Sequence, residues 1–340
     1  MLTPLPLVIT ANAAVGRRWA HHAIGILGGV SAGVTFLFGA LDLAGAGTTA
    51  AGAGNSNPLP VDVGIMFTAV IAATLVATPV RKRVARILPI DPDNPVHALA
   101  LVLAVLLLGT QATSIFFTNV VASNQTTLTL GDLIAQEVPF LILAGAGVGL
   151  FIRRNVAESA SRLGIVTPRW WHLVIALAAA GVFVAFGQTM DALSHTLTPD
   201  VARQIDSTTQ KLFGGLNNPV GIAAIALAPG ICEEVLFRGA LQPRLGLIAT
   251  ALLFASIHTQ YGFSLDTLSV FVIALGLGLI RKFTNTTTSS VCHITYNLVV
   301  GIGVAGSQLP VLVVVEAVLI AVSAYAIWSN RLRTAVRANP

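Results

Sequence analysis

The chain has 340 residues, of which 55% are hydrophobic and 10% charged, with a net charge of +5 and a mean hydropathy of +0.82. This composition excludes an ordinary soluble domain and is typical of a polytopic membrane protein. The isoelectric point of about 9.8 would suit a nucleic-acid-binding protein, but the basic residues form short clusters between apolar runs rather than a patch. We therefore expect the lipid bilayer as a partner and no nucleic acid.

Apolar runs of about 20 residues predict an all-α, polytopic membrane protein with about ten transmembrane helices, or about eight if the two weakest runs do not span. The weakest are the seventh, which is short, and the ninth, which is polar. In chain order the runs are residues 23–43, 62–80, 97–117, 130–152, 172–192, 219–238, 245–260, 265–281, 287–306 and 309–329.

Basic clusters precede the first run and follow the second, fourth, sixth, eighth and tenth. Of the 19 basic residues, only Arg203 and Lys211 fall in loops on the opposite side. Because Lys and Arg accumulate in cytoplasmic loops, both termini are expected in the cytoplasm. We predict a multi-pass protein of the plasma membrane.

A domain boundary is predicted after Arg169-Trp170-Trp171, an interfacial anchor that precedes the fifth run. The predicted parts are an N-terminal membrane half of unknown role (1–171), a C-terminal half (172–330) and a basic cytoplasmic tail (331–340).

Three loops on the outer side differ in composition. Residues 44–61 and 118–129 are rich in small and polar residues and are predicted to be turns or flexible connectors. The longest loop, 193–218, carries several charged residues and is expected to hold a short amphipathic helix on the outer surface.

Acidic residues of the N-terminal half are sparse. Asp42, Asp62 and Asp132 lie near the ends of runs, where water reaches them, and are given no functional role. Glu137 lies about a third of the way into the fourth run. It is the one acidic residue of this half that we single out for mutation.

The sixth run contains Glu233, Glu234 and Arg238. Ionised side chains at bilayer depth cost roughly 2.5–3.5 kcal/mol each, so they are rare there and usually functional. Glu234 and Arg238 stand four residues apart in the favourable order for an ion pair. Arg238 is expected to snorkel to the headgroups, so breaking the pair should cost about 1 kcal/mol. Glu233 lacks such a partner and suits a general base.

Two further runs carry polar residues at helical spacing. Phe254 and His258 share a face in the seventh run, and His293 and Asn297 share a face in the ninth. A lone histidine in an apolar helix is more often a core residue bonded to a neighbour. Polar groups on three successive apolar helices would each cost free energy unless they converged. We therefore expect Glu233, His258, His293 and Asn297 to line one pocket.

Such a set supports hydrolysis. A glutamate accepts a proton from water that an imidazole holds, while a second imidazole and a carboxamide stabilise an oxyanion. One glutamate and two histidines also meet the ligand requirement of catalytic zinc, with Glu233, His258 and His293 as ligands, although no HExxH motif is present. Both versions predict the same bond cleavage and differ in whether metal is needed.

The ordered motifs EExxxR followed by Gly (Glu233 to Gly239), FxxxH (Phe254 to His258) and HxxxN (His293 to Asn297) resemble those of the CPBP intramembrane protease family. This family is also called the CAAX-protease and bacteriocin-processing, or abortive-infection, family and includes the type II CAAX prenyl endopeptidases. The resemblance covers the C-terminal half and leaves the first five runs without a role.

The resemblance implies an endopeptidase that cleaves hydrophobic or lipidated, including prenylated, peptide substrates. It also implies a role for each motif residue. In it Glu233 activates water with His258, Glu234 and Arg238 support the site, and His293 with Asn297 forms the oxyanion site.

Two other functions fit intramembrane Glu and His residues. One is a proton-coupled transporter, and the other is a proteolytically inactive scaffold or immunity protein. A transporter of this size is expected to show polar groups and broken helices in both halves. Here the polar cluster occurs only in the second half, which favours the enzyme.

Straight helices would not assemble the motifs. Pro243 to His258 spans about 22 Å, whereas Glu234 lies about 12 Å above Gln242, so the groups would differ by about 10 Å in depth. We therefore expect tilt, or unwinding around Gly239 and Pro243. The cysteines that precede site residues are expected to pack as small apolar groups.

Overall fold

The structure, a computed structural model, describes residues 2–45, 57–118, 126–304 and 306–338, with side chains up to residue 330. Within these ranges it is helical throughout, with no β-strand beyond one isolated bridge between Leu150 and Arg154. The prediction of an all-α protein is confirmed.

Six described helical segments are long and apolar enough to cross a bilayer, and a seventh is added if a pair bent by 95° counts as one span. These properties support a polytopic α-helical membrane protein. The six are α2 (Ala20–Leu43), α5 (Pro95–Phe117), α6 (Leu130–Val148), α8 (Trp170–Leu197), the segment Pro219–Ser256, and Gly306–Asn330. The bent pair is α3 (Leu59–Thr74) and α4 (Thr78–Val84).

The predicted total of about ten spans is higher than this number. The sixth and seventh runs are counted together as Pro219–Ser256, although the backbone breaks at Gly246. This stretch comprises α10 (Pro219–Glu234), η3 (Val235–Leu241) and α11 (Gln242–Ser256). Helix α12 (Leu265–Phe283) carries three charged residues, and α13 (Thr286–Ile302) has only 17 residues. The exact number of spans and the side of the termini stay predictions.

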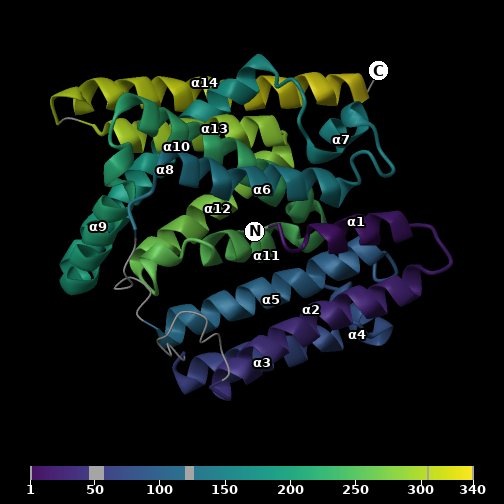
Figure 1. Cartoon of the computed structure of the whole chain (residues 1–340). Helices are drawn as coiled ribbons and strands as arrows, with labels where there is room; N and C mark the ends of the chain where they lie inside the picture. The colour runs from purple at the N-terminus through teal and green to yellow at the C-terminus, as the bar shows by residue number, and fades with distance from the viewer. Residues whose placement is uncertain (1, 46–56, 119–125, 305, 339–340) are drawn as a thin grey trace.

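The long helices lie side by side in a stack (Figure 1). Helices α2, α3 and α5 form one end, α11 and α12 lie in the middle with the short α1 (Leu5–Ala14), and α6, α8, α10 and α13 follow. Helix α14 (Leu309–Ala338) covers the other end. Helix α9 (Pro199–Phe213) projects at one side and confirms the short helix expected in the longest outer loop.

One apolar core crosses the predicted boundary at residue 171. It contains Val102 of α5 together with Phe237, Leu253, Phe254 and Ala274 from the C-terminal half. The N-terminal helices therefore buttress the segment that carries the second motif.

Some predicted features lie outside the described residues. Most of the two predicted connectors, 44–61 and 118–129, lies outside the described residues, which exclude 46–56 and 119–125. The predicted tail continues α14 as far as Ala338.

The segment between α10 and α11 is irregular. Residues Val235–Leu241 form a π-helix, and Gly246 has φ 80° and ψ 173°, a conformation that other residues rarely adopt. Unwinding was expected around Gly239 and Pro243. The π-helix includes Gly239, whereas Pro243 lies in the regular first turn of α11 and the sharp break comes at Gly246.

Candidate active site

The buried ion pair of Glu234 and Arg238 lies at the centre of the motifs. Their relative exposures are 0% and 1%, and Oε1 lies 2.8 Å from Nη1. Arg238 Nη2 donates to the carbonyl oxygen of Ala274 (3.3 Å), and its Cζ lies 4.2 Å from the centroid of the Phe254 ring. The expectation that Arg238 snorkels is wrong, because a carboxylate, a carbonyl and an aromatic face hold it inside the bundle.

His293 is the second partner of the same carboxylate. Its Nδ1 lies 3.2 Å from Glu234 Oε1, so the first and third motifs are in direct contact. Gly230 permits this approach, since a Cβ there would lie 2.5 Å from Cγ1 and 3.0 Å from the backbone nitrogen of Ile294. A side chain at position 230 would push α13 away from α10.

Phe254 connects the three motifs. Its ring centroid lies 5.2 Å from that of Phe237, 4.7 Å from that of His258 and 6.0 Å from that of His293. The predicted shared face of Phe254 and His258 is thus observed. Sequence reasoning did not count Phe254 among the site residues, although its spacing from His258 indicated the contact.

His258 follows the last turn of α11, and its Nδ1 lies 2.8 Å from the carbonyl oxygen of Phe254. A carbonyl oxygen only accepts, so Nδ1 carries the hydrogen and Nε2 of the neutral ring is left with its lone pair. The backbone thereby fixes the tautomer that can accept a hydrogen bond from water.

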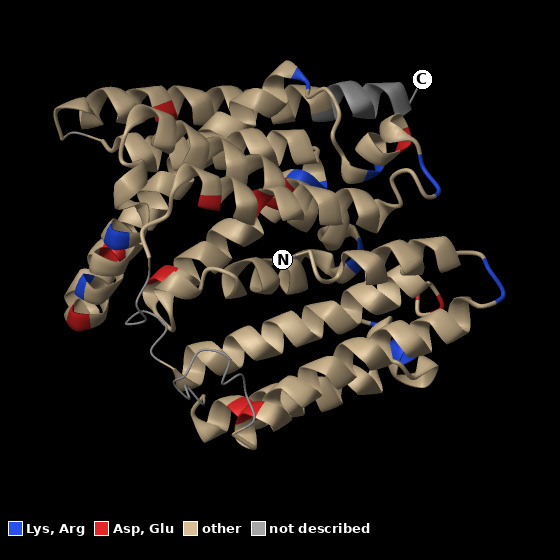
Figure 2. Ribbon diagram, viewed as in Figure 1, with Lys and Arg blue, Asp and Glu red and all other residues tan. Residues whose placement is uncertain are grey.

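Glu233 differs from its neighbour. Its side chain is 6% exposed and forms no hydrogen bond or ion pair with the residues that the structure describes, whereas Glu234 is engaged through Oε1 and leaves only its Oε2 without a donor. Buried carboxylate oxygens without a donor are rare and call for an explanation. In Figure 2 a few acidic residues lie inside the bundle, away from the charges at its ends.

Asn297 has one N–H already engaged. Its Nδ2 donates to the carbonyl oxygen of Ile225, at 3.3 Å. Pro229, four residues later in α10, has no N–H to offer that carbonyl. Asn297 therefore repairs a gap in the helix, and its second N–H is left for another acceptor.

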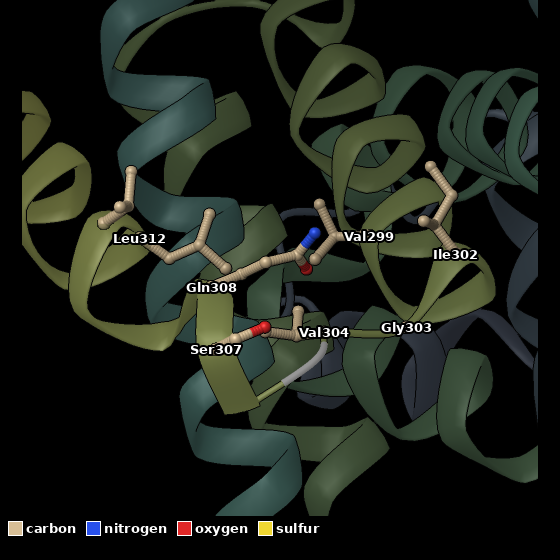
Figure 3. A pocket seen from close by; sticks show the side chains of 8 residues that line it. Val299, Ile302, Gly303, Val304, Ser307, Gln308 and Leu312 are labelled. Carbon is tan, nitrogen blue, oxygen red and sulfur yellow. The ribbon is translucent and has the colours of Figure 1, made fainter.

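A cavity of about 450 Å³ lies beyond the third motif, between the end of α13 and the start of α14 (Figure 3). It is lined mainly by apolar side chains such as Val299, Ile302 and Leu312. None of the predicted site residues lines it.

The predicted zinc ligands do not meet as a ligand set in this arrangement. Among the described side chains, one trio has ligand atoms within 4.8 Å of one another, and it is the exposed set Asp191, His195 and Asp206. Zinc at Glu233, His258 and His293 stays a prediction, and we derive no step through a metal.

Comparison with known proteins bears on the same segment. Residues 215–299 match the family model described as type II CAAX prenyl endopeptidase Rce1-like, and this range contains all three motifs. Neither the curated proteins nor the solved structures gave a match. The family match gives no support to the transporter or scaffold alternatives. The match over residues 215–299 supports a domain similar to the CAAX proteases, in which Glu234 joins the first and third motifs and Phe254 contacts all three.

Proposed function

We propose that the protein is an intramembrane endopeptidase that hydrolyses peptide bonds in hydrophobic or prenylated substrates by means of a glutamate base. One observation carries this proposal. Of two adjacent buried glutamates, Glu234 is held through Oε1 by Arg238 and His293, whereas Glu233 forms no hydrogen bond or ion pair with the described part of the chain.

In the proposed reaction Glu233 accepts a proton from water while the water oxygen bonds to the scissile carbonyl carbon. His258 accepts a hydrogen bond from the same water through Nε2. The carbonyl oxygen becomes an oxyanion, the C–N bond breaks, and the proton on Glu233 passes to the leaving amine. The products are a carboxylic acid and an amine.

The oxyanion would be stabilised by His293 and by the second N–H of Asn297. His293 donates from Nε2 only as an imidazolium, because Nδ1 already faces Glu234. The carboxylate of Glu234 orients the His293 ring through Nδ1, and Arg238 keeps that carboxylate in place. In this proposal the three residues therefore stabilise the transition state rather than the bound substrate.

The test uses the full chain in detergent with a farnesylated fluorogenic peptide. Glu233→Gln keeps the side-chain shape and removes the base, so turnover should fall by about 10²–10⁴-fold with the protein still folded. Glu316→Gln is the matched control, since Glu316 lies on α14 against Gly181, away from the motifs. Wild-type turnover in Glu233→Gln would refute Glu233 as the base.

A further inference from the structure

A second glutamate lies next to the site from a helix outside the family match. Glu137 of α6 is 7% exposed, and its Oε2, like that of Glu233, is inaccessible and has no donor in the described part of the chain. Most buried polar atoms in proteins are paired, and these two are carboxylate oxygens on neighbouring helices, so one shared proton would satisfy both.

Helices α6 and α10 run in the same direction. Leu130 and Val220, close to the beginnings of α6 and α10, line one hollow. Towards their ends the ring of Phe140 lies 6.1 Å from that of Phe237, edge to face. The two helices are therefore parallel neighbours over this length.

The register of these helices places the two glutamates opposite each other. Ala144 of α6 and Ala240 of η3 belong to one buried cluster. Glu137 precedes Ala144 by seven residues in α6, and Glu233 precedes Ala240 by seven across the end of α10 and the π-helix η3. Helix α6 packs against both α10 and η3, so the two glutamates come before these alanines on neighbouring helices. Glu137 and Glu233 are close enough to interact electrostatically, and so are Glu233 and Arg238.

We propose that Glu137 is a positioning residue of the active site, whose carboxyl group donates a hydrogen bond to Glu233 and orients it toward water. The inference rests on the proposed role of Glu233. An O–H···O⁻ bond between the two groups satisfies both buried oxygens with a single proton. The other ionisable groups around Glu233 are Cys232 and Glu234 beside it, Arg238 on η3, and His293 on α13 behind Glu234.

The activity test shows whether Glu137 acts as a hydrogen-bond donor to Glu233 or only fills space in the interior. Glu137→Leu removes the donor, so kcat should fall at least about tenfold at unchanged KM, while the melting temperature stays equal or rises. Glu137→Gln still donates through its amide and should keep kcat within about threefold of wild type. Gln136→Leu, at an exposed neighbouring position, is the control and should leave kcat unchanged.

Wild-type kcat in Glu137→Leu, or equal losses in the Leu and Gln variants, would overturn the proposal. If Glu137→Leu does not fold, Glu137→Met removes the donor with an unbranched chain. A readout independent of turnover is a double-mutant cycle of melting temperatures with Glu137→Leu and Glu233→Leu, each of which removes the proposed hydrogen bond. Coupled shifts support the contact and additive shifts contradict it, whether or not the wild-type protein cleaves the peptide.

Discussion

Two regions of the molecule bury charged side chains, and they do so differently. At the bend between α3 and α4, Arg81 is 0% exposed and every guanidinium nitrogen has a partner. Those partners are the carbonyl oxygens of Pro92 (2.6 Å), Leu75 (2.9 Å) and Val76 (2.5 Å) and the hydroxyl of Thr78 (3.0 Å). Arg81 closes the end of α3, where helix carbonyls would otherwise lack donors.

The motif region leaves part of its polar set without partners. Glu233 and Glu137 each keep an inaccessible oxygen without a donor in the residues described, although Arg238 lies close by. A burial-based search would rank Arg81 and Glu233 alike, since both are charged and enclosed. Arg81 has an acceptor for every guanidinium nitrogen and completes the fold, whereas Glu233 lies within the first motif without a hydrogen bond to the described residues and is therefore available for chemistry.

The largest effect is expected from breaking the buried pair of the motif region. Glu234→Gln leaves the cation of Arg238 enclosed, so the free energy of unfolding should fall by about 3–5 kcal/mol. Turnover should also fall, because His293 loses its carboxylate partner. Melting temperature and turnover in detergent check both effects, with Glu233→Gln as the neighbouring control. Equal stability losses in the two variants would mean that both glutamates belong to one structural unit.

A smaller loss is expected at the satisfied site. Arg81→Lys keeps the charge but cannot reach all the acceptors with one ammonium group, so stability should fall by about 2 kcal/mol while kcat is retained. Arg83→Lys, at an exposed position two residues on, is the matched control. A drop in kcat for Arg81→Lys at temperatures where it is folded would remove the distinction between the two regions.

Local spacing predicted the contacts within each helix. The pair of Glu234 and Arg238 and the facing rings of Phe254 and His258 follow from four-residue spacing, and both are observed. Both cysteines are buried, and Cys292 belongs to an apolar cluster, as expected. Hydropathy likewise predicted the helical membrane class.

The predictions that were wrong concerned features that depend on tertiary structure. Snorkelling of Arg238 was a sound inference for an isolated helix, but the carbonyl of Ala274 and the ring of Phe254 come from other helices. The break was expected near Pro243, but it occurs at Gly246, because glycine tolerates a φ of 80° that other residues rarely adopt. The proximity of Glu137 to Glu233 could not be predicted from the sequence, because it depends on how α6 packs against α10.

Asn297 has both kinds of role compared above, because one of its N–H groups completes the fold and the other is available for chemistry. One amide N–H satisfies the Ile225 carbonyl that Pro229 leaves without a donor, and the other is proposed to face the oxyanion. Asn297→Ala should lower stability by about 1 kcal/mol and reduce turnover by about 10²-fold or more. Thermal unfolding and peptide cleavage give the two quantities separately.

Pro229→Ala separates the two tasks of Asn297. Alanine at 229 restores the backbone N–H that can bond to Ile225 O within α10. Added to Asn297→Ala, it should therefore recover the lost stability and leave turnover low. If turnover also recovers, Asn297 acts only by closing a gap in α10, and the oxyanion would have to rely on His293. If neither recovers, the Ile225 carbonyl is not what Asn297 stabilises.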